Sequence, residues 1–404
     1  MSDWWKQWYE IKEAISDRGV VFYGRSEDWI PKALKKVQPI CIVDNNEKYH
    51  HTDYRDVSVF SPKEGLYSKN TKPYVVITAG IYDGIAAELI DMGFVPGQDF
   101  SCSPDYRDFR LLDDMREHDS KVLVACSDYN EETKARYSKS GGGLYLYDLQ
   151  SGVMEKKVSG SYRQMVWRND ELYAVEYVAC EVHVFDSEFK ITRRFTLDSP
   201  NYCGLAYNEK NDIFIIVNAG KDTISIHNGK DFELKKRVHY SGREHLGALS
   251  EHHLNDVTTD GDYIYVSFFS HSGNWKKGVF DGGVSQFEIS NLSSGPNLLV
   301  NGLWKPHSPE IIDGELCYLD SMRGRFYQKS QEYSGQFQSF ARGLAFDGKY
   351  YFIGASEDMY MSERFGHSDN IMLNAGFYMF DAKNKASRFY PMLGNMNIHD
   401  LMIM

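Results

Sequence analysis

The side chains best suited to chemistry form one dense cluster in the middle of the chain, Glu251-His252-His253-Leu254-Asn255-Asp256. Because side chains alternate between the two sides of a strand, an extended segment here sends His253 and Asn255 one way. Imidazole nitrogens and amide or carboxylate oxygens bind divalent metal ions, and a histidine outside a coordination shell can serve as a general base. The cluster therefore predicts a metal or acid–base site, although the same residues also suit a capped turn beside a satisfied core histidine.

Further candidate residues recur at intervals of tens of positions, without a compact motif such as His-Glu-x-x-His. Arg342 precedes Gly343, and its guanidinium suits a carboxylate or a phosphate through paired hydrogen bonds, or a salt bridge with Asp320 or Glu357. By contrast, the turn arginines Arg323 and Arg325 are expected to be solvated. The predicted ligands of a divalent metal are Glu176, His253, Asn255 and Asp320, and the predicted catalytic residues are His253, His307, Arg342 and His399.

An internal repeat fixes where these residues lie. Each copy has a polar start, a short apolar strand, a turn rich in Asp, Asn or Gly, and a second strand of aromatic and β-branched residues, which is typical of a hairpin. Residues 397–402 match only the first strand of a copy, and residues 121–130 with 143–152 match only the second and third strands. Complementary half-copies at the two ends predict a ring closed by the last strand, which is a six-bladed β-propeller over residues 113–404. The five full copies span residues 161–177, 201–219, 253–269, 306–321 and 340–356.

In a propeller blade the first strand begins, and the second strand ends, on the same face of the ring near its axis. Polar residues at these positions are therefore expected to surround one central depression. Two long excursions between strands, residues 271–283 with Trp275 and residues 358–374, are predicted to be a lid or binding loop and a surface loop, respectively. The first-strand starts include Arg163, Cys203, Asn255, His307, Arg342 and His399, and the second-strand ends include Glu176 and Asp320.

The first 112 residues alternate apolar strands with helical stretches, which predicts a small Rossmann-like α/β domain over residues 1–112. Gly24 follows the first strand and Asp44 ends the second, the positions from which such folds contact a nucleotide. The full Gly-x-Gly-x-x-Gly is missing, since Arg25 to Glu27 stand where further glycines are needed. The pattern disfavours a standard NAD site. It favours instead a nucleotide-sugar bound near Gly24 and Asp44, or no ligand at all.

The composition of the chain limits the classes of partner that the protein is expected to bind. A net charge of -12 argues against a nucleic acid or an anionic membrane as partner, because both need a basic surface. No apolar run approaches the length of a membrane span, and the six cysteines occur singly. These features predict a cytoplasmic protein with free thiols that acts on a small molecule, with a protein partner also open.

Several segments resemble known families. His-Leu-Asn-Asp-Val (253–257), Pro-His-Ser-Pro (306–309) and Arg-Gly-Leu-Ala-Phe (342–346) resemble an uncharacterised bacterial propeller family. Asn255-Asp256-Val257 before a glycine turn is distantly similar to the gluconolactonase and senescence-marker propellers, and this likeness implies Asn255 as a metal ligand. The first 110 residues, with Phe22-Tyr23-Gly24 and Ile42-Val43-Asp44-Asn45, resemble domains attached to sugar methyltransferases and nucleotide-sugar acetyltransferases.

These resemblances imply a role in surface-glycan or nucleotide-sugar metabolism. The main functional prediction is an enzyme that acts on a sugar-derived substrate at the central face of the propeller, with metal assistance as in a lactonase-like hydrolase. The alternative is a non-catalytic propeller that binds a glycan or a protein as a scaffold in a biosynthetic complex. Fold alone does not choose between them.

Overall fold

The computed structural model describes residues 5–67, 72–127, 141–241, 250–328, 332–357, 374–395 and 397–404. The second excursion that the sequence predicts, residues 358–374, lies outside them except for Asn374. The chain forms two compact units, residues 1–117 and 118–404, so the boundary lies five residues beyond the predicted one. No helix in the described ranges is long and apolar enough to cross a membrane.

The N-terminal unit is built on one six-stranded sheet with the order β3-β4-β2-β1-β5-β6. Five of its strands run parallel, and the edge strand β3 pairs antiparallel with β4. This mixed sheet is compatible with the expected Rossmann-like domain, which stays a prediction. The strands are β1 (Val20–Tyr23), β2 (Cys41–Val43), β3 (Thr52–Tyr54), β4 (Val57–Phe60), β5 (Tyr74–Ile77) and β6 (Phe100–Cys102).

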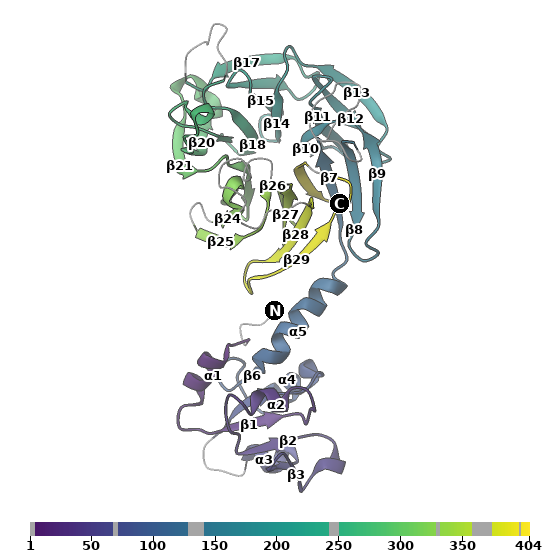
Figure 1. Ribbon diagram of the computed structural model, residues 1–404, viewed down its shortest axis with the longest axis vertical. Helices are drawn as coiled ribbons and strands as arrows, with labels where there is room; N and C mark the ends of the chain where they lie inside the picture. The colour runs from purple at the N-terminus through teal and green to yellow at the C-terminus, as the bar shows by residue number, and fades with distance from the viewer. Residues whose placement is uncertain are drawn as a thin grey trace. The chain divides into compact units, whose positions relative to one another are not determined.

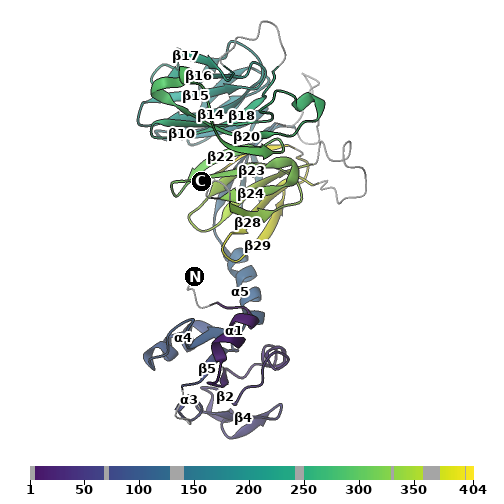
Figure 2. The ribbon, with the colours of Figure 1, turned by 90° about the vertical axis from the view of Figure 1, so that its left-hand side faces the viewer.

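Helices cover both faces of this sheet, which explains why its strands read as continuous apolar runs. Val21 and Tyr23 pack with Leu89 on one face, whereas Val20 and Phe22 pack with Ile11 on the other. Helices α1 and α4 accordingly lie on opposite sides (Figure 2). The helices are α1 (Trp8–Ile15), α2 (Ile30–Ala33), α3 (Pro62–Tyr67), α4 (Tyr82–Asp91) and α5 (Pro104–Glu117).

The second unit is a six-bladed β-propeller, as the repeat predicts (Figure 1). Each blade is a four-stranded antiparallel sheet, and β10, β14, β18, β22, β26 and β30 are the inner strands, each in contact with the next around the ring. Blade 6 combines the last strand of the chain with β7 to β9, and Ile398 pairs with Cys126, so the predicted closure is confirmed. Blades 1 to 3 comprise β10 (Tyr162–Arg168), β11 (Glu171–Glu176), β12 (Glu181–Phe185), β13 (Ile191–Thr196); β14 (Tyr202–Asn208), β15 (Ile213–Asn218), β16 (Thr223–Asn228), β17 (Leu234–His239); β18 (Leu254–Asp260), β19 (Tyr263–Phe268), β20 (Gly282–Glu288) and β21 (Asn297–Leu303). Blades 4 to 6 comprise β22 (His307–Ile312), β23 (Glu315–Asp320), β24 (Arg325–Gln328), β25 (Glu332–Gln336); β26 (Phe340–Phe346), β27 (Tyr351–Ser356), β28 (Gly376–Asp381), β29 (Ala386–Pro391); β30 (Ile398–Ile403), β7 (Lys121–Cys126), β8 (Gly143–Asp148) and β9 (Met154–Ser159).

Every inner strand carries a β-bulge near its start. The register against the second strand shifts between Tyr162 and Met165 in β10, and between Leu254 and Val257 in β18. The equivalent shifts occur in the four other inner strands. A bulge breaks the ladder locally and leaves backbone N–H groups that need another acceptor.

Side chains of neighbouring blades bind these backbone groups, and the resulting hydrogen bonds run around the whole ring. In blade 1, Gln164 Oε1 accepts from Leu205 N of blade 2 and Val257 N of blade 3, both at 3.0 Å. Blade 6 binds blade 1 and blade 3 binds blade 4 in the same way, through Asp400 Oδ2 to Met165 N (2.8 Å) and Asp256 Oδ2 to Ser308 N (2.8 Å). Ser308 Oγ then accepts from Gly343 N of blade 5 (2.8 Å), and Ser356 Oγ of blade 5 accepts from Ile398 N of blade 6 (3.0 Å).

Gly343 shows how closely the inner strands approach one another. Its φ of 82° is a left-handed conformation, and a Cβ there would lie 3.0 Å from Asp400 C and from Leu401 N. Glycine is therefore required at this contact between blades 5 and 6.

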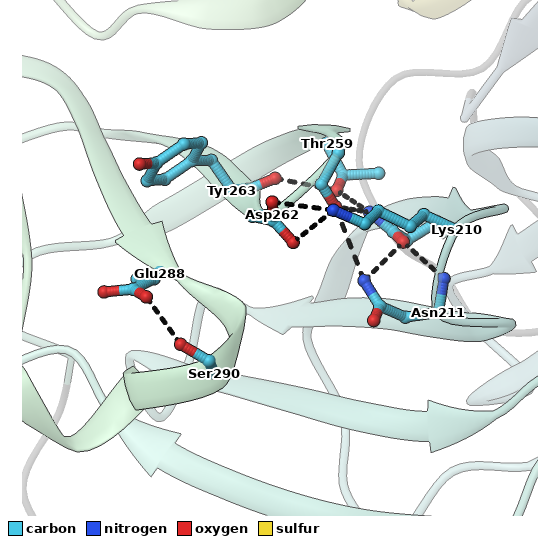
Figure 3. A network of polar contacts seen from close by, with 9 residues as sticks. Lys210, Asn211, Thr259, Asp262, Tyr263, Glu288 and Ser290 are labelled. Atoms are coloured by element: carbon cyan, nitrogen blue, oxygen red, sulfur yellow. Dashed lines mark hydrogen bonds and ion pairs between the residues drawn. The ribbon is translucent and has the colours of Figure 1, made fainter.

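At the hairpin turns between first and second strands, blades 2 and 3 are joined by a separate polar network (Figure 3). Lys210 Nζ lies 2.7 Å from Asp262 Oδ2, but both side chains are largely exposed, so this pair stabilises little. The buried Asn208 donates to Thr259 Oγ1 (2.7 Å) and to Gly261 O (2.9 Å). The buried amide is therefore the stronger connection between these turns.

Candidate active site at the propeller axis

Three of the inner-strand bulges bring two arginines and one histidine together. Arg163 Nη1 of blade 1 contacts both ring nitrogens of His399 of blade 6, Nε2 more closely than Nδ1, and Arg342 Nη1 of blade 5 lies 2.9 Å from the same Nε2. Arg342 is further positioned by Ser356 Oγ (3.1 Å) and Asn397 Oδ1 (2.9 Å). Arg163 stacks on the Tyr177 ring at 4.2 Å and keeps part of its side chain accessible to solvent.

The central imidazole of this group is neutral. Burial and then the adjacent charges of Arg163 and Arg342 hold the pKa of His399 well below its usual value. A neutral imidazole has only one nitrogen that accepts a hydrogen bond. Two cationic donors therefore converge on a single acceptor.

His307 is a neutral imidazole whose tautomer is fixed by its surroundings. Its Nδ1 lies 2.9 Å from the Lys305 carbonyl oxygen, which only accepts hydrogen bonds, so Nδ1 carries the proton and Nε2 carries the lone pair. Ser321 Oγ lies 2.8 Å from the same nitrogen. Burial and the charge of Arg342 lower the pKa of His307 well below its usual value.

Aromatic rings connect His307 to both sides of the site. Its ring packs edge-on against Phe269 at 5.3 Å and Phe340 at 5.5 Å, and Phe340 in turn lies 5.0 Å from the Arg342 guanidinium carbon. His253 lies on the far side of Phe269, 4.4 Å from it. A series of ring contacts therefore connects His253, through Phe269, His307 and Phe340, to the guanidinium of Arg342.

His253 and the 271–283 excursion meet in this belt. The Trp275 ring lies 4.6 Å from the His253 ring, and both keep part of their surface accessible to solvent. The excursion is held in shape by Asp281, which accepts hydrogen bonds from Ser270 Oγ (2.6 Å) and Ser272 N (2.9 Å). Burial and the charge of Lys305 lower the pKa of His253 to about 3. The excursion thus contacts His253 through Trp275, whereas its role as a binding loop or a lid stays a prediction.

Buried carboxyl groups lie among the same inner strands. Burial raises the pKa of Asp256 to about 6 and the pKa values of Glu310 and Asp400 well above the usual range. At neutral pH, Asp256 therefore offsets part of the charge of the two arginines. The Cys203 thiol is protonated, because burial raises its pKa to about 11.

The predicted metal ligands do not come together. Both carboxylate oxygens of Glu176 accept backbone hydrogen bonds, from Ser161 N (2.6 Å) and from Ala179 N. Asp320 accepts from Trp304 N (2.8 Å) and pairs with Arg323 (3.0 Å), so Arg323 is not merely solvated as expected. Across the described part of the chain, no group of three or more His, Cys, Asp or Glu side chains has the geometry to hold a metal ion. Asn255 lies in the β18 bulge with its carbonyl oxygen facing Gly204, and the metal itself stays a prediction without a ligand set.

In the N-terminal unit, the predicted nucleotide contacts have structural partners. Asp44 Oδ2 accepts from Arg25 N (2.6 Å), and Asp44 Oδ1 accepts from Asn46 N (2.8 Å). Gly24 has a φ of 96°, and a Cβ there would lie 2.2 Å from Ala79 Cβ, so the glycine serves close packing of β1 and β5. Nucleotide binding at Gly24 and Asp44 stays a prediction.

Of the predicted catalytic residues, the structure joins Arg342 to His399 and links His307 and His253 to them through aromatic rings. Two further members of the site, Arg163 and Tyr177, were not among the predicted catalytic residues or metal ligands, although Arg163 was predicted to lie at the central depression. Arg163 occupies the same place in its repeat as Arg342 and His399, and this equivalence is the signal that could have identified it. Tyr177 follows a second strand, and its hydroxyl donates to Asn201 Oδ1 (2.7 Å), which no pattern in the sequence indicates.

Comparisons with known proteins add a family and a fold. A family model described as "Domain of unknown function (DUF4915)" matches residues 153–375, more than half of the chain. No curated protein matches. Similar solved structures include the nidogen/laminin complex (9% identity, TM-score 0.47, covering 71% of this chain and 98% of that chain). A protein of unknown function from Bacteroides caccae (11%, 0.47, 71% and 99%) and a candidate 6-phosphogluconolactonase from Bacteroides fragilis (12%, 0.45, 71% and 98%) are also similar.

Proposed function

Since the chain belongs to the DUF4915 family of domains of unknown function, we propose its activity from the axial geometry: it is an enzyme that binds an anionic, sugar-derived small molecule at the central face. In this proposal Arg163 and Arg342 bind a carboxylate or phosphate of the substrate, and His307 acts as general base. A sugar-derived substrate is favoured by the segments that resemble sugar-modifying enzymes, and a role in surface-glycan or nucleotide-sugar metabolism rests on the same likeness.

The observation that carries the proposal is the convergence of two guanidiniums on one neutral imidazole. Guanidinium groups match carboxylate and phosphate oxygens with parallel hydrogen bonds. A bound anion would offset the positive charge of the two guanidiniums, and Arg163 keeps part of its side chain accessible to solvent. It would also offset the field of Arg342 at His307, which lowers the pKa of that imidazole, so substrate binding itself would make His307 a stronger base.

Binding and turnover need separate tests. Isothermal titration with hexuronates, hexose phosphates and neutral hexoses should give binding only with the two anionic classes. Arg163→Ala and Arg342→Ala should each weaken that binding by at least tenfold, because each removes a charge-assisted contact of about 1.5–3 kcal/mol. Arg194→Ala, on the exposed outer strand β13, is the matched control for loss of one positive charge and should bind normally.

The alternative, a propeller that binds without reacting, is favoured by the partly exposed rings of Trp275 and Trp304 near the same face. His307→Gln discriminates the two functions. In the enzyme this variant still binds the anion but loses turnover, whereas in a binding module no turnover exists to lose. An axial site that binds no anionic sugar in the wild-type protein would contradict both forms of the proposal.

A further inference from the structure

We propose that the reaction at the axis begins with removal of a proton from the carbon adjacent to a substrate carboxylate. The substrate is then a sugar acid, and the product is its epimer or the unsaturated acid formed by elimination. This inference rests on the proposed function and adds to it the bond that breaks.

Stabilisation of the product of proton removal is the first requirement. Loss of that proton converts a carboxylate into an enediolate, whose two oxygens carry two negative charges. Arg163 Nη1 and Arg342 Nη1 both contact Nε2 of the His399 ring, Arg342 at 2.9 Å, so two cationic donors face the same small region. Preorganised charges of this kind act strongly where water is excluded and where the negative charge develops.

An oriented base is the second requirement. The hydrogen bond to the Lys305 carbonyl leaves the lone pair of His307 on Nε2. Edge contacts with Phe269 and Phe340 fix the plane of the ring, and Phe340 also contacts the Arg342 guanidinium. Phe340 therefore contacts both the base and the guanidinium that would bind the substrate carboxylate.

Three side chains near the axis that could instead attack a carbonyl carbon are not activated. Ser321 Oγ faces the protonated Nδ1 of His307, which cannot accept its proton. Ser308 Oγ lies 3.3 Å from Asp256 Oδ2 and accepts from Gly343 N, so its hydroxyl serves the contacts between blades. The Cys203 thiol is protonated at neutral pH. Within the described part of the axis, the groups present suit proton transfer better than covalent catalysis.

The proposed step balances without a further reactant. The α-proton moves to His307 Nε2, and the electron pair of the C–H bond becomes the second bond between the α-carbon and the carboxylate carbon, with charge on both oxygens. In epimerisation that pair forms a new C–H bond with a proton that solvent delivers to the opposite side of the α-carbon. In elimination the pair instead becomes the second bond between the α- and β-carbons, and the β-oxygen leaves with the electron pair of the Cβ–O bond and takes a proton from solvent. The imidazolium returns its proton to solvent.

Deuterium exchange tests this step directly. The full-length protein is incubated in heavy water with hexuronates and aldonates, and incorporation at the α-carbon is followed by NMR and mass spectrometry. The wild-type protein should introduce deuterium into at least one sugar acid, with or without formation of a conjugated product. His307→Gln should exchange at least about 100-fold more slowly while it still binds the acid, and Arg194→Ala should behave as wild type.

Other results separate this inference from the proposed function. Binding of sugar acids without any deuterium incorporation, or equal exchange by wild type and His307→Gln, would overturn proton abstraction and leave the anion site in place. Cleavage of a sugar lactone or ester with no α-exchange would do the same and favour hydrolysis. Failure of every anion to bind would remove the proposed function itself.

Discussion

The backbone carbonyl of Lys305 decides which nitrogen of His307 carries a proton. Lys305 and Ser308, on either side of His307, both have a left-handed φ of 51°, a conformation that non-glycine residues adopt only when neighbours hold it. Ser308 is held by Asp256 of the preceding blade. The geometry of one imidazole thus depends on a contact between two blades, and a change at Asp256 should disturb His307 without touching it.

The low pKa of His253 makes a prediction about acid stability. In the unfolded chain this imidazole has a pKa near 6.5, whereas in the folded protein the value is about 3. Below pH 6.5 the unfolded state takes up a proton that the folded state does not, so the stability from this group is complete above pH 6.5 and falls as the pH falls toward 3. In the wild-type protein this group should lower the free energy of unfolding by about 2 kcal/mol between pH 7 and pH 5. His253→Phe should not show that loss.

Denaturant unfolding of both proteins at pH 5 and pH 7 measures this difference. The comparison cancels the opposite effect of Asp256, whose raised pKa favours the folded state as the pH falls, because both proteins contain it. Parallel stability curves for His253→Phe and wild type would mean that His253 is protonated equally in the folded and unfolded states.

The cysteines provide a second prediction at this scale. All six are free thiols, and Cys180 alone is partly exposed while the other five are buried. A maleimide should therefore modify one thiol per native chain, slowly, because burial also raises the pKa of Cys180. Mass spectrometry of peptides should locate it at Cys180, and Cys180→Ser should remain unmodified until it is unfolded. Native labelling at Cys203 would show that the axis admits the reagent.

At the scale of elements, the bulges of the inner strands both join the blades into a ring and position the residues of the candidate site. Each bulge frees backbone N–H groups, and side chains such as Gln164, Asp256 and Asp400 accept from them across the blades. The neighbouring bulge positions hold Arg163, Arg342 and His399. A functional residue at the axis is therefore placed by a strand irregularity that also joins the blades.

Replacing Gln164 measures how much these hydrogen bonds between blades contribute to the free energy of unfolding. Its side chain satisfies three buried backbone groups, because Oε1 accepts from two N–H groups and Nε2 donates to Val257 O (2.8 Å). Gln164→Leu keeps the size but leaves these groups unpaired, which should lower the free energy of unfolding by roughly 2–5 kcal/mol. Gln286→Leu, at a partly exposed position of β20, should change it by less than about 0.5 kcal/mol. Equal effects in urea unfolding would refute a special role for the inner-strand amide.

The blades can be predicted from the sequence, whereas the bulges cannot. Inner and second strands are apolar and recur, so the repeat and the closure by residues 397–402 are readable. The outer strand of each blade escaped recognition, because strands such as β13 and β17 are exposed and rich in charged residues, without an apolar pattern. A bulge changes neither composition nor period enough to be read.

The candidate site was predictable in part for the same reason. The repeat brought Arg342, His307 and His399 to one face, yet it treated every polar residue there alike. Glu176 and Asp320 end their second strands, and each binds the backbone that leads into the first strand of its own blade, at Ser161 N and Trp304 N. Whether a carboxylate faces the axis or caps a turn depends on tertiary hydrogen bonds that no local pattern encodes.

At the scale of the whole molecule, β30 determines whether the propeller is closed. It supplies the inner strand of blade 6, its Asp400 binds Met165 N of blade 1, and its Ile398 N binds Ser356 of blade 5. Deleting residues 398–404 should therefore abolish cooperative unfolding of the second unit, since the lost contacts rival the 5–15 kcal/mol that holds a typical domain. Deleting Met404 alone should have little effect.

Scanning calorimetry distinguishes the two deletions, and near-ultraviolet circular dichroism reports on the packing of the many aromatic rings. A sharp transition in the longer deletion within a few degrees of the wild-type temperature would show that five blades and three strands suffice. In that case β30 would contribute His399 to the site but would not be needed for a folded propeller.

The place of β30 in the chain also has a consequence for biosynthesis. Strand β7 ends at Cys126 and its partner β30 begins at Ile398, so about 270 residues are translated between the two paired strands. At 5–20 residues per second the exposed edge of β7 waits on the order of 10–50 s for its neighbour. During that time the nascent protein carries an apolar strand edge that is open to other chains, so a chaperone that shields it on the ribosome would raise the yield of native protein more than one that acts after release.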